Sequence, residues 1–245
     1  MRVVRLYTHQ QLAPDAELEL EDDIRHYALN VLRLNKRSLL IVFNGDGYDY
    51  PCEILDYRKS VLRIKILEKV SLKSESPLTT HLLLSISKSS HMDYAIQKSV
   101  EAGVSLIQPI LSERSVSKAT KKSFENKRQH WQRVIQSTCE QCGRAKIPEL
   151  LKISEINEIK KLNKNEHGLI FDSAANQTIN DLNIIRPNIL KLLIGPEGGF
   201  SDNEIKSILE NNYQAVRFGP RIMRTETAAV AAVLKAQSKW GDLEH

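Results

Sequence analysis

Hydrophobic positions in the first part of the chain follow the pattern of short strands. Four apolar runs of strand length occur there: RVVRLY (2–7), SLLIVF (38–43), YDYPCEIL (48–55) and VLRIKILEKV (61–70). The Asn-Gly-Asp-Gly segment at 44–47 is typical of a hairpin turn between two of these runs. One segment, DDIRHYALNVLRL (22–34), has apolar residues at helical spacing. We therefore predict a compact, mostly β domain with one helix over residues 1–72.

The pattern changes after the polar segment SLKSESPLT (71–79), where Pro77 favours a break. Strand-like runs follow at HLLLSIS (81–87), VSLIQPIL (104–111), GLIF (168–171), LKLLI (190–194) and AVRF (215–218). Helical spacing separates them at HMDYAIQKSVEAG (91–103), KRQHWQRVIQSTCEQC (127–142), SDNEIKSILENN (201–212) and TETAAVAAVLKAQSKW (225–240). Strands that alternate with helices indicate parallel βαβ units, so we predict an α/β domain over residues 73–242. Residues 243–245, Leu-Glu-His, are typical of the start of a vector-encoded histidine tag.

The composition indicates a globular chain without a membrane anchor. Hydrophobic residues make up 41% of the 245 residues. No run approaches the roughly 18 uncharged apolar residues that a transmembrane helix needs. The N-terminal segment MRVVRLYTHQ also lacks the apolar core of a signal peptide. We therefore expect a cytoplasmic protein that does not bind a membrane.

The three cysteines, Cys52, Cys139 and Cys142, do not predict a redox or metal site. Cys139 and Cys142 have the spacing of a redox motif, but they lie late in a predicted helix rather than at its start, where the helix dipole would lower the thiol pKa. A zinc site would need a second pair of ligands, and one thiol remains. We interpret the cysteines as packing or incidental residues and expect no metal.

Positive charge is concentrated in one window. The chain carries a net charge of +5, whereas residues 114–146 contain nine Lys or Arg against two Glu, a net charge of +7. A basic region on a near-neutral body is typical of a polyanion-binding surface. A solvated, lysine-rich loop would have the same composition. Charge alone leaves both interpretations open.

Three predicted strands end in segments with candidate chemistry. They lead into DSAAN (172–176), GPEGGF (195–200) and GPRIMR (219–224). Ligands of open α/β sheets bind beyond the carboxyl ends of the strands, and glycines let a ligand approach the backbone. Ser201 and Glu204 form a capping box that starts the next helix. Neither GxGxxG nor a Walker GxxxxGKS/T motif is present, and GPEGGF on its own would also suit a tight strand-to-helix turn.

The two glycine-proline segments carry a family resemblance. IGPEGGFSDNEI (194–205) together with FGPRIMRTETAAVAA (218–232) resembles the signature of SPOUT-class RNA methyltransferases, specifically the RsmE family. The similarity extends from residue 1 to about residue 242, through RHYALNVLRL, AIQKSVEAGVSLIQPILSERS and CEQCGRAKIPEL. Phe218 and Met223 stand where leucines are common in the family, which keeps the segment apolar. The family methylates N3 of a uridine in the decoding region of bacterial 16S rRNA.

The resemblance implies a fold, a cofactor and partners. It implies a PUA-like small β-barrel domain that helps to bind RNA, and a SPOUT α/β domain with a deep trefoil knot. It also implies a homodimer that acts on 16S rRNA or the small ribosomal subunit. S-adenosylmethionine would bind in the knot, at loop residues of the three strand ends. The residues implied for cofactor binding are Phe171, Leu193, Ile194, Gly195, Glu197, Gly198, Gly199, Phe218, Gly219, Ile222 and Met223.

Two residues are candidates for catalysis under this resemblance. Uracil N3 carries a proton at neutral pH, so the enzyme must align N3 with the methyl group and stabilise the developing anion. The guanidinium of Arg224 suits a carbonyl oxygen or phosphate beside the base, and Glu226 is the candidate general base. Glu226 would equally suit a carboxylate that stabilises the first turn of a helix. Glu197 is an alternative base, although a role at a ribose hydroxyl or in shaping the loop fits it as well.

Six basic residues are candidates for RNA contact: Arg2, Arg5, His26, Arg33, Arg114 and Arg144. Each of them also has a structural interpretation, and Trp131 is predicted to pack in a helix rather than to stack on a base. Two other functions stay open on the sequence. One is a SPOUT methyltransferase with another rRNA or tRNA target, and the other is a non-catalytic RNA-binding assembly factor.

Overall fold

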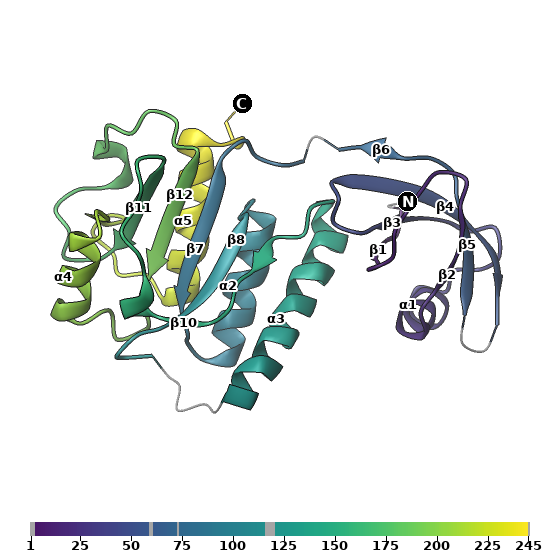
Figure 1. The fold of residues 1–245 in the computed structure, drawn as a ribbon, viewed down its shortest axis with the longest axis horizontal. Helices are drawn as coiled ribbons and strands as arrows, with labels where there is room; N and C mark the ends of the chain where they lie inside the picture. The colour runs from purple at the N-terminus through teal and green to yellow at the C-terminus, as the bar shows by residue number, and fades with distance from the viewer. Residues whose placement is uncertain (1–2, 59–60, 73, 116–120, 245) are drawn as a thin grey trace. The chain divides into compact units, whose positions relative to one another are not determined.

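The structure is a computed structural model. It describes all residues except 1–2, 59–60, 73, 116–120 and 245, and it does not describe the side chains of residues 121–123. The chain forms two compact units (Figure 1). The N-terminal unit contains residues 1–75 and 136–147, and the C-terminal unit contains residues 76–135 and 148–245. The first unit therefore includes a segment, 136–147, that lies far beyond the change of pattern near residue 72.

The N-terminal unit is built on one sheet with the strand order β1-β3-β4-β5-β2. The strands are β1 (Arg5–Tyr7), β2 (Glu17–Leu20), β3 (Leu39–Phe43), β4 (Tyr48–Tyr57) and β5 (Leu62–Ile66), and the short β6 (Val70–Ser71) pairs with β4. β3 and β4 pair antiparallel across the predicted hairpin turn, where Gly45 and Gly47 have φ of 93° and 92°. These positive φ values explain why the turn uses glycine.

The single helix predicted in this unit has two parts. α1 (Asp22–His26) continues directly as a π-helix over Tyr27–Val31, and Arg33 then adopts a positive φ of 56°. Ala28 of this segment is fully buried and packs in the core of the unit. Strand residues supply the rest of that core: Leu6, Leu20, Leu40, Val42, Tyr50, Cys52, Ile54, Leu62, Ile64 and Ile66.

The C-terminal unit contains a parallel sheet with the order β10-β8-β7-β12-β11-β13, and β9 pairs with β8. Its strands are β7 (Thr79–Ser85), β8 (Leu106–Leu111), β9 (Glu149–Leu150), β10 (Ser154–Glu155), β11 (Glu166–Phe171), β12 (Ile189–Ile194) and β13 (Gln214–Val216). The strands β7, β12 and β11 lie at the centre, and most of their buried residues are Leu or Ile, as in parallel strands covered on both faces. The predicted α/β domain is confirmed.

Helices complete the chain: α2 (Ser89–Glu101), α3 (Lys121–Cys142), α4 (Asp202–Glu210) and α5 (Thr225–Trp240), with 3₁₀ turns at Ile156–Glu158 and Ile179–Asp181. α5 packs against α2 and against β7 and β12, and Figure 1 shows α2 and α5 behind the sheet. Ile208 of α4 packs in a cluster with Leu83 and Leu193 of the sheet. Trp131 of α3 is 2% exposed, which confirms the prediction that it packs in a helix. No helix in the described part of the chain is long and apolar enough to cross a membrane.

The cysteines of the N-terminal unit are free thiols. Cys52 and Cys139 are buried. A hydrogen bond with Cys142, together with burial, raises the pKa of the Cys139 thiol far above its usual range. A reactive thiol needs the opposite shift, so the expectation of packing cysteines agrees with the structure.

Candidate functional site

The three glycine-rich or polar strand ends lie beside one another in the sheet. β11 is the neighbour of both β12 and β13, and Phe171 pairs with Ile194 on one side and with Val216 on the other. The three strands therefore end at the same level, and the loops that follow them leave the sheet together. This register brings the three strand ends together at one edge of the sheet.

The loops surround a cavity of about 530 Å³. Ten of the eleven positions predicted to bind the cofactor line it: Phe171, Ile194, Gly195, Glu197, Gly198, Gly199, Phe218, Gly219, Ile222 and Met223. The eleventh, Leu193 of β12, does not line the cavity. It is fully buried in a hydrophobic cluster with Leu83 and Ile170. Arg224 lines the cavity as well.

Further lining residues were not among the predicted positions. They are Asp172, Ser173, Pro196, Phe200, Ile205, Arg217, Arg221, Thr225 and Ala228. Most belong to the same three loops. Ile205 and Ala228 lie in the first turns of α4 and α5, four residues after Ser201 and Arg224. Residues four apart lie on the same face of a helix, and this spacing could have predicted both positions.

The backbone of the GPEGGF segment is fixed from within. Gly199 N donates to Pro196 O at 2.9 Å, and Gly199 has a φ of 67°, a conformation that other residues adopt at a cost. A Cβ at Gly195 would lie 3.2 Å from the ring of Phe200, so this glycine permits close packing. The predicted capping box is present, because Ser201 and Glu204 each accept a hydrogen bond from the backbone N–H of the other.

Neighbouring side chains hold this loop from outside. Arg114 donates to the carbonyl oxygen of Gly198 at 2.9 Å, and the hydroxyl of Thr225 donates to the carbonyl oxygen of Gly195 at 3.1 Å. The rings of Phe171 and Phe218 stack with their centroids 4.4 Å apart, and both line the cavity. The cavity thus has an aromatic wall and a fixed glycine backbone.

The charged groups of the cavity have few partners inside the protein. Among the described residues, none forms a hydrogen bond or ion pair with the side chain of Arg221 or Arg224. Oε2 of Glu226 is buried and has no hydrogen-bond partner in the described part of the chain. His91 Nδ1 lies 3.7 Å from that atom and 3.3 Å from Oε1 of Glu197. Arg221, Arg224 and Glu197 therefore line the cavity, and the histidine that contacts Glu197 also lies near the unpartnered oxygen of Glu226.

The chain matches two family models. One, described as an RNA methyltransferase domain, matches residues 74–237, and another, described as an RNA methyltransferase PUA domain, matches residues 20–67. The ribosomal RNA small subunit methyltransferase E of Buchnera aphidicola subsp. Schizaphis graminum is 40% identical over 243 residues, which are 99% of this chain and 98% of the relative. The chain belongs to this family. The RsmE resemblance is thereby confirmed, as are the PUA-like domain and the methyltransferase domain.

Solved structures agree over the whole length. A methyltransferase of Legionella pneumophila in complex with S-adenosylmethionine is 35% identical, with a TM-score of 0.93, and the match covers 99% of this chain and 100% of that one. The ribosomal RNA small subunit methyltransferase E of Neisseria gonorrhoeae, bound to S-adenosylmethionine, is 33% identical, with a TM-score of 0.91 and the same coverage. The trefoil knot that the resemblance implies stays a prediction.

Three of the residues predicted to contact RNA have partners within the protein. Arg5 donates to both carboxylate oxygens of Asp49 and to the carbonyl oxygen of Cys139, and its side chain is 7% exposed. Arg144 forms a two-pronged ion pair with Glu75 and is 8% exposed. Arg114 supports the GPEGGF segment. These guanidinium groups therefore have structural roles that the sequence analysis weighed but did not locate.

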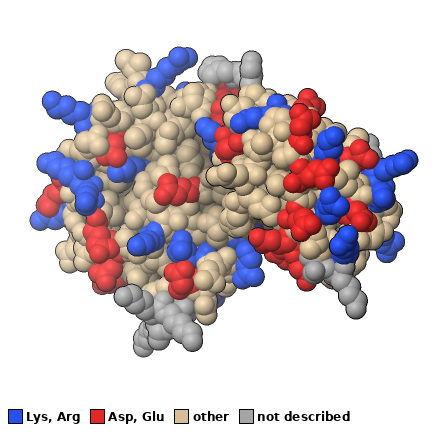
Figure 2. Space-filling view, turned by 45° about the vertical axis from the view of Figure 1, so that its right-hand side comes forward, with Lys and Arg blue, Asp and Glu red and all other residues tan. Residues whose placement is uncertain are grey.

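The other candidates for RNA contact differ in exposure. His26 and Arg33 of the PUA-like unit are exposed, and Arg2 lies outside the described residues. In the basic window, Arg128 pairs with Glu125 on α3, while Arg133 and Lys146 are exposed. On the face shown in Figure 2, basic and acidic side chains are interspersed. The window thus contains both arginines with structural roles and cations that are exposed to solvent.

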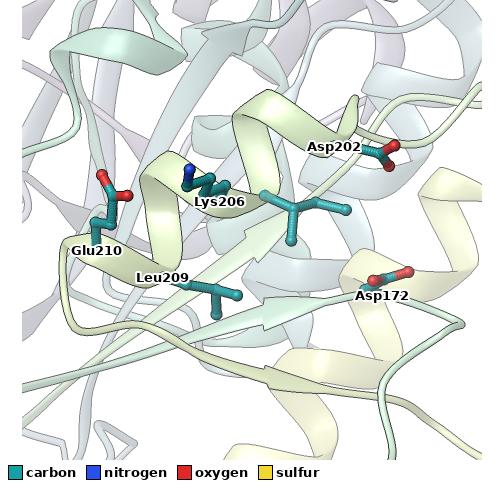
Figure 3. A pocket seen from close by; sticks show the side chains of 6 residues that line it. Asp172, Asp202, Lys206, Leu209 and Glu210 are labelled. Atoms are coloured by element: carbon teal, nitrogen blue, oxygen red, sulfur yellow. The ribbon is translucent and has the colours of Figure 1, made fainter.

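A second, open depression of about 560 Å³ adjoins the cavity on the side of α4. Figure 3 shows Asp172 and Asp202 at one end of it and Glu210 at the other, with Leu209 and Lys206 between. Asp172 also lines the main cavity, and its carboxylate accepts a hydrogen bond from Ala174 N at 3.0 Å. Asp172 therefore shapes the turn after β11 from within.

Proposed function

We propose that the protein transfers the methyl group of S-adenosylmethionine to N3 of a specific uridine in the decoding region of 16S rRNA. One observation carries the proposal. The three strand-end loops of a family member enclose one cavity, which Arg224 lines without a partner among the described residues. Glu226, two residues further on, has a buried Oε2 without a hydrogen-bond partner in the described part of the chain. A pocket for a nucleoside cofactor beside an arginine and a carboxylate is what transfer to a base nitrogen requires.

The cavity suits the cofactor. Its volume of about 530 Å³ is in the usual range for small-molecule sites. The stacked rings of Phe171 and Phe218 offer an apolar wall for an adenine, and the glycines of the GPEGGF segment expose backbone groups for hydrogen bonds. Glu197 adds an exposed carboxylate that suits ribose hydroxyls. We assign cofactor binding to the predicted positions that line this cavity.

The side chains supply alignment, charge and a proton acceptor. The cofactor provides a methyl group on a positively charged sulfur, which accepts the electron pair of the broken bond. Uracil N3 loses its proton to the carboxylate of Glu226 as it takes the methyl group. Arg224 stabilises the negative charge that develops on the neighbouring carbonyl oxygen, because its guanidinium is charged and free of partners among the described residues. The products are a 3-methyluridine, the demethylated cofactor and one proton.

Glu226 is a better base than Glu197 on the geometry. Glu226 is 13% exposed in its side chain, and its Oε2 has no hydrogen-bond partner among the described residues, whereas Glu197 is 35% exposed. A carboxylate that served only to cap α5 would bond to backbone N–H groups at the start of the helix. The unpartnered oxygen of Glu226 supports the role of base over that of a cap.

RNA recognition would combine the PUA-like unit with cations around the cavity. N3 takes part in base pairing, so the target uridine must be unpaired or turned out of its helix. We assign phosphate contact to exposed residues such as His26, Arg33 and Arg133. Arg5 and Arg144 are buried in ion pairs, and the exposed Arg114 bonds to the backbone of Gly198. We also propose that the enzyme is a homodimer and acts in the cytoplasm on 16S rRNA or the small subunit.

The proposal is tested with labelled S-adenosylmethionine and two substrates, naked 16S rRNA and small subunits from cells that lack the modification. Digestion and nucleoside mass spectrometry then identify and locate the methyl group. We expect 3-methyluridine at one position, and the substrate that yields it shows which assembly state is recognised. Cofactor binding without transfer to either substrate would contradict the proposal. Light scattering of the purified protein would test the homodimer.

A further inference from the structure

His91 lies in the first turn of α2, and one nitrogen of its ring faces two carboxylates from two other segments. Nδ1 is 3.3 Å from Oε1 of Glu197, in the loop after β12, and 3.7 Å from Oε2 of Glu226, in the first turn of α5. The histidine side chain is 29% exposed. Nothing in the sequence singled out His91, because a lone histidine at a helix start has no local signature.

The geometry around Glu226 is incomplete. Its Oε2 is buried and has no hydrogen-bond partner in the described part of the chain. Leaving a buried carboxylate oxygen unpaired costs free energy, because the oxygen loses water without gaining a donor. The described residues include no Lys or Arg that forms an ion pair with Glu226, and His91 Nδ1 is within ion-pair distance of it. His91 is therefore the natural donor for this oxygen.

A single N–H at Nδ1 bonds well to one of the two carboxylates at a time. At 3.3 Å the contact with Glu197 is a long hydrogen bond, whereas 3.7 Å to Glu226 exceeds hydrogen-bond range. A shift of a few tenths of an ångström would exchange one partner for the other. Glu197 lines the cofactor cavity, so a ligand that engages its carboxylate would release Nδ1 toward Glu226.

We propose that His91 is a positioning residue for Glu226: in the complex it donates Nδ1–H to Oε2 and orients the other carboxylate oxygen toward uracil N3. The inference rests on the proposed function. A base that is itself oriented by a third group is a recurring arrangement in enzyme sites. Here that third group, His91, is also linked to the cofactor cavity, because Glu197 lines the cavity and competes for the same N–H.

The other charged groups near His91 do not interfere with this exchange. Asp93, on the same helix, bonds instead to His130 Nε2 of α3 at 2.9 Å. Lys98, near the end of α2, pairs with Glu101. Glu197 and Glu226 are thus the carboxylates that face His91 within 4 Å among the described residues.

The test compares His91→Ala, His91→Asn and His130→Ala with the wild-type protein. Asparagine keeps an N–H donor near the position of Nδ1, whereas alanine removes it. His130→Ala is the matched control, because it removes a histidine that is bonded to a carboxylate on α2 but contacts neither Glu197 nor Glu226. For each protein, kcat and KM for the RNA, the dissociation constant of S-adenosylmethionine and thermal unfolding are measured.

We expect kcat of His91→Ala to fall by about 10²-fold, the range of a misaligned general base, with KM and cofactor affinity changed by less than about threefold. His91→Asn should recover most of that loss, and His130→Ala should match the wild type. A purely structural role would instead lower thermal stability or cofactor affinity and spare kcat.

Three results would overturn the inference: an unchanged kcat in His91→Ala, a loss of cofactor affinity as large as the loss of rate, or a folded His91→Asn protein as slow as His91→Ala. Failure of the proposed function is distinguishable from these results, because the wild-type protein would then form no 3-methyluridine. That outcome would remove the inference together with its basis.

Discussion

Arg5 in the N-terminal unit and Arg224 in the C-terminal unit belong to opposite environments. The guanidinium of Arg5 binds both oxygens of Asp49 and the carbonyl oxygen of Cys139, and it stacks over the ring of Phe43 at 4.5 Å from the centroid. Arg224 is exposed at the cavity edge, and no described residue bonds to its side chain. The sequence analysis predicted RNA contact for Arg5 and a catalytic role for Arg224, and the sequence alone did not show that only one of them is buried in an ion pair.

The difference separates groups whose partners lie within the protein from groups that have none among the described residues. Buried polar groups in folded proteins are almost always hydrogen-bonded, so an unpaired one needs an explanation. The pairs Arg5–Asp49 and Arg144–Glu75 satisfy that rule within the protein. Oε2 of Glu226 does not, and the exposed Arg224, which lines the cavity of the C-terminal unit, has no partner among the described residues.

The largest effect is expected from Asp49→Ala, which removes the partner of a buried arginine. The side chains of Arg5 and Asp49 are 7% and 9% exposed, so the substitution leaves a buried cation without its counterion. We expect the free energy of unfolding to fall by about 3–5 kcal/mol in urea denaturation. Glu17→Ala is the control, because it breaks an ion pair with Arg63 in which both side chains are exposed and should cost less than about 1 kcal/mol. Equal costs in the two variants would contradict the structural role of Arg5.

Arg224→Ala tests the opposite side of the comparison. Because Arg224 has no partner among the described residues, its removal should leave thermal unfolding unchanged. Loss of the charged donor beside the reacting base should lower kcat by about 10²–10³-fold while S-adenosylmethionine still binds. Arg224→Lys keeps the charge without the planar fork, so an intermediate rate is expected from it. A wild-type rate in Arg224→Ala would remove this residue from the mechanism.

The sequence predicted the parts of the site that depend on local patterns. Apolar runs located the strands, and glycine, proline and capping residues located the loops between them. Ile205 and Ala228 were missed because they lie inside helices that the pattern assigned to packing. β2 was missed because its residues, Glu17–Leu20, alternate too briefly to give a signal. The partners of Arg5 and Arg144 lie 44 and 69 positions away in the chain, beyond the reach of local patterns.

His81 tests whether an unpaired buried atom always marks a ligand site. Its Nε2 is buried without a hydrogen-bond partner among the described residues, yet His81 lies on β7 and does not line the cavity. Burial, with repulsion from Lys191, lowers the pKa of His81 to about 4. The unfolded chain therefore binds this proton below about pH 6.5, whereas the native state binds it only near pH 4.

The native state thus loses stability from His81 as pH falls from 6.5 to 4. Each unit of difference between the two pKa values corresponds to about 1.4 kcal/mol. The loss in the free energy of unfolding therefore approaches about 3 kcal/mol at pH 4. His81→Gln should lose that much less stability than the wild type between pH 7 and pH 4, as measured by urea denaturation at each pH. Parallel pH dependence in the two proteins would show that the imidazole is readily protonated in the native state.

The smallest effect is expected in the backbone of the cavity itself. Gly199 has a φ of 67° and open space where a Cβ would lie, so Gly199→Ala would cause backbone strain but no steric clash. We expect it to lower the free energy of unfolding by about 1 kcal/mol. Gly198→Ala is the matched control, because its Cβ would make an ordinary 3.4 Å contact with the flexible side chain of Arg114. Urea denaturation of the two variants without ligand separates conformation from packing. If Gly198→Ala were the less stable variant, the contact with Arg114 rather than the backbone of Gly199 would control the shape of this loop.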